Sequence, residues 1–335
     1  MQEHATKPIQ PVEDEGLLFG CILDGDGGAQ SIYWAELETW SEIDKPLWVH
    51  LNLSEPRVQS WLAQSSGLSQ VTSEALRAPE SRPRVFHGKR GFVTILRGVN
   101  TNPGSAPEDM VALRIWSDGQ RVITLRHEKL MTPLDILNRL LGEGYGPRNA
   151  AELYQSLITR LTERIGVTVD TLGEDLDGIE VRMEIDAGTD LRREVSEMRR
   201  KLVSLRRYLA PQREALGSLL ANPPEWLDDA SRLRLREAAD RAVLYIEEID
   251  ASREQSLVLK DEISNRLAEA TNRTLYVLAI VSGIFLPFGF LTGLFGINIG
   301  GMPGTSSASG FLIFCGVLLG LLIAELIVFK RLKWF

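Results

Sequence analysis

The feature that most constrains this chain is an apolar run from Leu275 to Phe295, which contains no charged residue over 21 positions. As an α-helix, a run of that length extends about 31 Å and matches the hydrocarbon thickness of a bilayer. A second apolar run, Phe311–Phe329, contains one ionisable acid, Glu325, and is separated from the first by a glycine-rich, uncharged segment, 296–310. The sequence therefore predicts two membrane spans, 275–295 and 311–329, with an external loop at 296–310 and a short tail at 330–335.

The charges that flank the two runs predict their orientation. Arg266 and Arg273 precede the first run, and Lys330, Arg331 and Lys333 follow the second, whereas the loop between them has neither lysine nor arginine. By the positive-inside rule, both termini are cytoplasmic and the loop is external. The first residues, MQEHATKPIQPVEDEG, lack the cationic start and apolar core of a secretory signal. We therefore expect a multi-pass protein of the cytoplasmic (inner) membrane.

Composition narrows the choice of partners. Of the 37 basic and 45 acidic residues in the chain, 34 and 44 precede residue 274, so the soluble part is acidic. An acidic surface argues against nucleic acid as a partner and is compatible with metal cations. The two cysteines, Cys21 and Cys315, cannot build a disulfide framework.

Residues 1–150 read as a cytoplasmic α/β domain. Short runs rich in β-branched residues predict strands, and SDGQ (117–120) between two of them predicts a hairpin turn. Ser54 reads as the cap of a short helix. The predicted strands are Leu17–Leu23, Pro46–Leu53, Gly91–Val99, Val111–Trp116 and Arg121–Arg126.

The next two segments are helical. In 151–225, apolar residues recur at three and four residues from Leu153 to Met183, and a second helix, Leu191–Pro211, follows the Ala187-Gly188 interruption. The stalk, 226–274, contains no proline or glycine and keeps helical spacing through Leu233 and Ile249. The sequence predicts one helix of 68 residues, 228–295, that enters the membrane without a break. A hinge near Thr274 is the alternative.

Two spans in one chain cannot enclose an aqueous path, so a pore requires several copies around a common axis. Small residues on one face of the first span favour this arrangement, since they let helices approach closely or line a narrow path. Helix packing alone is the alternative explanation. The face consists of Ser282, Leu286, Gly289, Gly293 and Gly296.

Continued toward the stalk, the same face carries an apolar collar and then a carboxylate. Leu275 and Leu278 form a constriction of the kind that gates by excluding water, and a ring of Asp261 side chains favours cations. At the other end, Gly296-Ile297-Asn298 offers neutral oxygens, with Asn298 as a second candidate metal contact. A solvated carboxylate is the alternative reading of Asp261.

The combination of a long cytoplasmic region, a stalk helix, Gly-x-Asn and a second span resembles the CorA superfamily of divalent-cation transporters. The run FLPFGFLTGLFGINIGGMPG, from Phe285 to Gly304, is similar to the zinc-transporting ZntB branch in its LTGLFG approach and its GGMPG continuation. Ile297 stands where the magnesium branch usually has methionine, and Gly304 follows Pro303 where that branch commonly has an acidic residue.

The resemblance implies a funnel-shaped homopentamer, in which stalk helices line the pore and the α/β domains surround a cytoplasmic vestibule. It also implies Zn²⁺ and related ions such as Cd²⁺, Ni²⁺ and Co²⁺ as transported ions rather than resident cofactors, and proton-coupled uptake has been proposed for that branch. The alternatives are a Mg²⁺/Co²⁺ channel of the same superfamily and a membrane-anchored cytoplasmic sensor or scaffold.

Other chemistry-bearing residues favour structural roles. His50, His87 and His127 have no chelating spacing. The acidic segment GEDLDGIEVRMEID is expected to be a solvated helix face that pairs with the basic helix after it, and a surface that concentrates or senses cations is the alternative. Glu325 is either a proton site or an interfacial carboxylate beside KRLKWF. No nucleophile–base pair or cofactor loop is recognisable, so the sequence predicts a non-enzyme.

Overall fold

The computed structural model describes residues 14–41, 45–79, 82–185, 189–296 and 308–331. The chain divides into two compact units, residues 1–261 and residues 262–335. Each unit is considered by itself. The predicted mixed architecture is confirmed, with an α/β region first, a long helix next and two apolar helical segments last.

The described residues of the first unit form one mixed sheet of seven strands, in the order β2-β1-β3-β7-β6-β5-β4. The central pair β3 and β7 is parallel, with Leu47 opposite Arg121, and the other neighbouring pairs are antiparallel. The strands are β1 (Leu17–Leu23), β2 (Ala29–Ile32), β3 (Leu47–Asn52), β4 (Arg84–His87), β5 (Phe92–Gly98), β6 (Val111–Ser117) and β7 (Arg121–Arg126).

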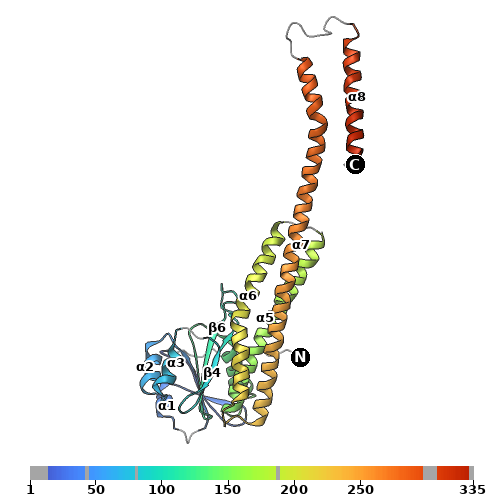
Figure 1. Cartoon of the computed structure of the whole chain (residues 1–335). Helices are drawn as coiled ribbons and strands as arrows, with labels where there is room; N and C mark the ends of the chain where they lie inside the picture. Colours follow the sequence, from blue (N-terminus) through green and yellow to red (C-terminus); the bar gives the residue numbers. More distant parts are fainter. Residues whose placement is uncertain (1–13, 42–44, 80–81, 186–188, 297–307, 332–335) are drawn as a thin grey trace, which may run out of the picture. The chain divides into compact units, whose positions relative to one another are not determined.

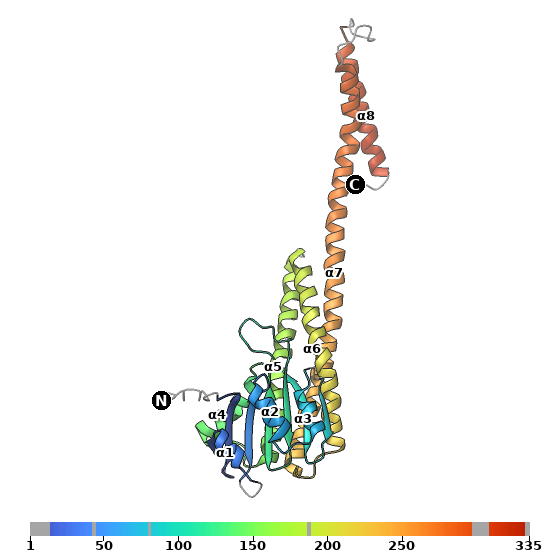
Figure 2. The ribbon, with the colours of Figure 1, turned by 90° about the vertical axis from the view of Figure 1, so that its left-hand side faces the viewer.

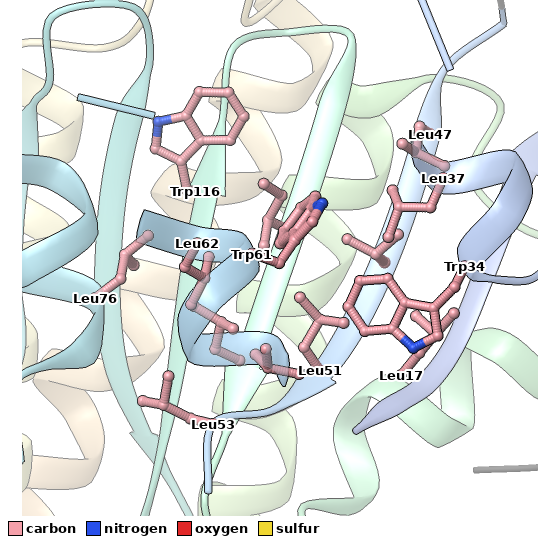
Figure 3. Packing of buried hydrophobic residues seen from close by; sticks show 14 of the residues in the cluster. Leu17, Trp34, Leu37, Leu47, Leu51, Leu53, Trp61, Leu62, Leu76 and Trp116 are labelled. Carbon is pink, nitrogen blue, oxygen red and sulfur yellow. The ribbon is translucent and has the colours of Figure 1, made fainter. Parts of the chain in front are cut away.

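Three short helices pack on one face of this sheet: α1 (Trp34–Thr39), α2 (Pro56–Gln64) and α3 (Gln70–Arg77). Trp34 and Trp61 meet edge to face, with ring centroids 6.0 Å apart, and Leu62 and Leu76 extend the same buried cluster to Trp116 of the sheet. Figure 3 shows these side chains between helices and strands. Alternate strand residues supply the sheet side of this core, as the period of two requires.

Long helices cover the other face. After α4 (Met131–Asn138) and a π-helical turn, η1 (Arg139–Glu143), the chain forms α5 (Ala150–Ile185) and α6 (Thr189–Ala221), both of which contact the sheet. The hydroxyl groups of Tyr154 on α5 and Thr94 on β5 lie 2.5 Å apart in this buried layer. The long helices and the sheet appear in Figures 1 and 2.

The apolar spacing predicted for α5 is confirmed, because its members from Leu153 to Met183 are buried. On α7 (Asp229–Gly296) the prediction was wrong for Leu233, which is 60% exposed. The inward face of α7 in this unit is instead set by Leu235, Ala238, Ala242, Ile246 and Ile249. Leu233 falls outside that spacing.

Several boundaries differ from the prediction. Helix α6 continues through Pro211 to Ala221, and α2 begins at Pro56 with Glu55 as its cap rather than Ser54. Proline suits the first turn of α2, where its missing N–H leaves no helical bond unmade. Strands β2 and β4 were missed because each has only four residues, at the two edges of the sheet. The five predicted strands and the SDGQ hairpin are confirmed.

Helix α7 has 68 residues and is continuous through Thr274, whose hydroxyl donates to the carbonyl of Ala270 at 3.0 Å. This continuity agrees with the single predicted helix, shifted by one residue, and leaves no break in helical structure at the alternative hinge. The second unit contains the later part of α7 and α8 (Gly310–Arg331).

Candidate functional site

The candidate site lies on the second unit, where α7 and α8 are both long and apolar enough to cross a membrane. Their large side chains are widely exposed in the single chain, including Phe285 at 68%, Phe311 at 76% and Leu312 at 72%. A surface of this kind needs lipid or neighbouring protein to cover it. The two helices are therefore the segments that a membrane or a second copy would cover.

Two contacts define how α8 meets α7. The rings of Phe295 on α7 and Phe314 on α8 have centroids 5.0 Å apart. A methyl group added at Gly283 would lie 3.1 Å from Cζ of Phe329. Because higher numbers on α8 lie beside lower numbers on α7, the helices run antiparallel. The half-buried positions on this side of α7 are Ile280, Gly283, Ile284, Pro287, Phe288 and Leu291.

The predicted stripe occupies a different face of α7. A methyl group added at Gly289, Gly293 or Gly296 would meet none of the described residues within 4 Å. On a helical wheel of 100° per residue these positions lie on the side opposite Pro287 and Leu291. Leu275, Leu278 and Leu286 of the same stripe are 56%, 60% and 70% exposed, and Ser282 is half-buried. The stripe is thus left open by the part of the chain that the structure describes.

Of the two predicted metal contacts, the structure describes Asp261 but not Asn298. Asp261 is exposed on α7, at the last position of the first unit, and makes no ion pair with the described residues. Ile297 and Asn298 lie outside the described residues, as does most of the predicted loop. Among the residues that the structure describes, no three His, Cys, Asp or Glu side chains gather closely enough to hold a metal ion.

His50 has a structural role in the core. The Thr124 hydroxyl donates to the carbonyl of Val49 at 2.9 Å, so its oxygen accepts from Trp48 Nε1 and His50 Nδ1, each at 2.9 Å. The proton of the neutral ring is therefore on Nδ1, and Nε2 is buried without a partner among the described residues. Burial, with repulsion from Arg126, holds the pKa of His50 well below its ordinary value.

The remaining histidines and the buried cysteine lie apart from the stripe. His87 is exposed on β4, with Nε2 3.3 Å from the Asn222 carbonyl oxygen. Nδ1 of His127 lies 3.2 Å from the Ser54 hydroxyl, and partial burial lowers the pKa of this histidine. Burial raises the pKa of the Cys21 thiol to about 12, so the thiol is held protonated.

The acidic segment does form an ion pair with α6, but with the expected charges reversed: Arg182 of the segment pairs with Glu194 of α6. In the described residues, Asp177 and Glu180 of α5 accept from the side chain of Gln255 on α7, at 3.3 and 2.7 Å. The basic helix α6 instead reaches α7, since Arg206 Nε lies 2.6 Å from Asp250 Oδ1. The acidic side chains of Asp177 and Glu180 therefore meet a residue of α7, and the ion pair between α5 and α6 uses a basic residue of the segment and an acidic residue of α6.

Sequence reasoning missed one polar feature of the α7–α8 contact. The Oε2 atom of Glu325 on α8 is inaccessible to solvent and has no hydrogen-bond partner among the described residues. The isolated acid was visible in the apolar run, but its shielding depends on the face of α8 that turns toward α7. Only the packing of the two helices decides which face of α8 that is.

Comparison with known proteins places this arrangement in context. The family model described as "CorA-like Mg2+ transporter protein" matches residues 44–331. A Pseudomonas aeruginosa protein named "Divalent cation transporter CmaX" is 36% identical over 326 residues, 96% of this chain and 98% of that protein. A Yersinia enterocolitica protein named "Zinc transport protein ZntB" is 32% identical over 312 residues, 93% and 94% of the two chains.

Solved structures agree with this result. The structure described as the full-length CmaX protein is similar with a TM-score of 0.84 and 35% identity, and the match covers 96% of this chain and 99% of that one. The complete CorA magnesium transporter from Methanocaldococcus jannaschii has a TM-score of 0.75 at 16% identity, over 95% and 98% of the two chains. At 16% identity, the similarity to the magnesium transporter shows a shared fold only.

Proposed function

This chain belongs to the CorA-like Mg²⁺ transporter family, and we propose that it carries Zn²⁺ and related divalent cations, namely Cd²⁺, Ni²⁺ and Co²⁺, across the cytoplasmic membrane. It is a membrane transporter of divalent cations, in keeping with the names of its relatives. The ion is the cargo, and the function needs no resident cofactor.

The observation that carries this proposal is the open face of α7. No described residue lies within 4 Å of a methyl group added at Gly289, Gly293 or Gly296, on the side of the helix that α8 leaves uncovered. A tether would need only a lipid-facing pair of helices, whereas a face of small residues suits close approach to other copies of α7. Several such faces around an axis would enclose a path.

Self-association is therefore part of the proposal. We propose a homopentamer, the number that the family resemblance implies, in which the α7 stripes face a common axis and the outer faces of α7 and α8 contact lipid. Leu275 and Leu278 would then form an apolar collar, and Asp261 would add a ring of carboxylates. Both chain termini would be cytoplasmic, since the cations lie at the ends of the two spans and not between them.

The choice of zinc over magnesium rests on the sequence at the outer end of the path. Gly296, Ile297 and Asn298 would form the mouth, with oxygens that contact a hydrated ion without holding it tightly. Ile297 and the uncharged GGMPG run are similar to the ZntB branch. The 32% identity to a protein named for zinc transport supports the same choice. Uptake coupled to protons is the form of transport that we propose.

A flux assay tests the proposal. The full chain is reconstituted in liposomes that contain a zinc-sensitive or magnesium-sensitive dye, and ion entry is measured with and without a pH gradient. We expect Zn²⁺ entry above that of empty liposomes, faster when the outside is more acidic, and reduced in Asn298→Ala. Zinc entry no faster than in empty liposomes under any gradient would overturn the proposal.

The same assay separates the rival functions. Magnesium flux that exceeds zinc flux and is blocked by cobalt hexammine, a mimic of hydrated Mg²⁺, would identify a Mg²⁺/Co²⁺ channel. A dimer in detergent, together with Asn298→Ala flux and stability equal to those of the unsubstituted chain, would favour an anchored sensor or scaffold. The expected pentamer is measured by light scattering of the protein in detergent.

A further inference from the structure

Glu325 lies on the side of α8 that packs against α7. The positions of α8 that are half-buried or buried recur at three and four residues, which defines one helix face. Glu325 is the ionisable member of this face, and it precedes buried Phe329 by one helical turn. The members of the face are Gly310, Phe314, Leu318, Leu321, Leu322, Glu325 and Phe329.

The part of α7 at the level of Glu325 contains a break in helical hydrogen bonding. Phe329 meets Gly283, and one turn along each antiparallel helix brings Glu325 to the level of Pro287. Proline has no backbone N–H, so Pro287 inside α7 leaves the carbonyl of Gly283 without its usual donor. Helical carbonyls point toward the C-terminus, and the Gly283 oxygen therefore points along α7 toward Pro287.

The charged and titratable groups around Glu325 are few. On α7, 275–295 contains one titratable side chain, Tyr276, which lies two turns from Gly283 on the side away from Pro287. On α8, Lys330 and Arg331 are five and six residues beyond Glu325, outside the three- and four-residue spacing of helical ion pairs. Cys315 is ten residues before it. Within the described residues, no ion pair to Glu325 is formed and its Oε2 has no partner.

A carboxylate in this position would leave its shielded Oε2 atom in an apolar layer without a donor, which is costly. A neutral carboxylic acid has an O–H group to donate, and the Gly283 carbonyl is an acceptor that lacks its helical donor. We propose that Glu325 is a protonation site within the membrane and that its acid form donates a hydrogen bond to the Gly283 carbonyl oxygen. The inference rests on the proposed transport function and names a residue for its proton dependence.

The proposed step is a proton transfer alone. A proton from water binds Oε2, and the new O–H group donates to the Gly283 oxygen and joins α8 to α7 beside Pro287. When the proton leaves, that hydrogen bond is lost and a negative charge remains between the helices. The two protonation states therefore differ in how firmly α8 holds α7, the helix that carries the open stripe. The rate of ion transport would depend on pH because of this difference.

The test measures zinc flux into proteoliposomes between pH 5.5 and 7.5, with the full chain and three variants. We expect the unsubstituted chain to show a pH-dependent rate and Glu325→Gln, which cannot ionise, to lose most of that dependence. Cys315→Ser, an exposed substitution on the same helix, should keep it.

A second variant acts on the proposed acceptor. Pro287→Ala restores a backbone N–H that competes for the Gly283 carbonyl, and it should favour helix folding. We expect Pro287→Ala to weaken the pH dependence although Glu325 is intact. Infrared spectra of the unsubstituted chain should also show a protonated carboxyl band that changes with pH and is absent from Glu325→Gln.

The outcomes separate this inference from the function on which it rests. An unsubstituted chain that carries zinc independently of pH, or Glu325→Gln with an unchanged pH dependence, would overturn the role of Glu325 and leave zinc transport standing. An unsubstituted chain without zinc flux would overturn the function itself. If Glu325→Gln fails to assemble, Pro287→Ala and the infrared spectra provide the test. The inference is overturned if Pro287→Ala keeps the pH dependence of the unsubstituted chain and the unsubstituted chain shows no carboxyl band that changes with pH.

Discussion

Phe329 of α8 packs against Gly283 of α7, so closely that a methyl group at Gly283 would lie 3.1 Å from Cζ of the ring. The contact joins two helices across 46 residues of sequence. Gly283 has less room for an added methyl group than Gly289, Gly293, Gly316 or Gly320, where such a group would meet no described residue within 4 Å.

Gly283→Val should therefore lower the thermal unfolding midpoint of the full chain in detergent. Phe329→Ala relieves the crowding, so the double variant should be less destabilised than the sum of the two single changes, with a coupling of about 1 kcal/mol. Gly316→Val is the matched control, because a methyl group there meets no described residue within 4 Å. Strictly additive effects would contradict the contact.

Acid should destabilise the α/β region through His50. Its pKa in the folded chain lies well below the ordinary 6.5, so the unfolded chain binds a proton that the folded chain excludes as the pH falls below 6.5. The free energy of unfolding should then decrease by up to about 1.4 kcal/mol per pH unit until the folded-state pKa is reached. No such loss is expected from this group above pH 7.

Unfolding midpoints from pH 7.5 to 5 measure this effect in the full chain. His50→Gln should be less stable at neutral pH, since it disturbs a buried layer, but should show a shallower loss with acid. His87→Gln, an exposed position, should retain the slope of the unsubstituted chain. An unchanged slope in His50→Gln would show that other groups cause the acid dependence.

Removing the charge of Asp135 should lower the free energy of unfolding more than breaking an exposed ion pair on a helix. Its carboxylate accepts from Arg160 Nε at 3.0 Å and from Arg164 Nε and Nη2 at 2.8 and 3.0 Å, and the aspartate side chain is 19% exposed. Asp135→Asn leaves two partly buried guanidinium groups without their shared anion, and should cost about 1–3 kcal/mol.

The control is Glu197→Gln. It breaks a pair with Arg193, whose side chain is 82% exposed, and should change stability by less than about 0.5 kcal/mol. Denaturant unfolding of both variants gives the comparison. Equal effects at the two sites would mean that the Asp135 network does not hold α4 against α5.

The proposed collar predicts a leak. Leu275→Ser and Leu278→Ser should raise basal ion flux severalfold, because a polar constriction no longer excludes water. Val277→Ser is the control, since Val277 is 54% exposed but lies on another face of the same turn. Basal flux equal in the Leu278 and Val277 variants would remove the collar from the proposed path.

Sequence patterns within short windows were sufficient to predict most of the helices and strands of this protein. The charge-free run from Leu275 and the unbroken stalk predicted the long helix to within one residue at each end, because hydrophobic period and the absence of proline or glycine act locally. The strand pattern likewise predicted β1, β3, β5, β6 and β7. The four-residue edge strands β2 and β4 carry too little pattern to be recognised.

What the sequence alone determined was therefore which segments are helical, which are apolar and where small residues recur. Tertiary structure decided which faces meet: that Gln255 rather than the basic helix contacts Asp177 and Glu180, and that Gly283 rather than Gly289 receives an aromatic ring. It also decided that Oε2 of Glu325 is shielded. Periodicity marks a face on each helix, but the partner of that face depends on packing between residues far apart in the chain.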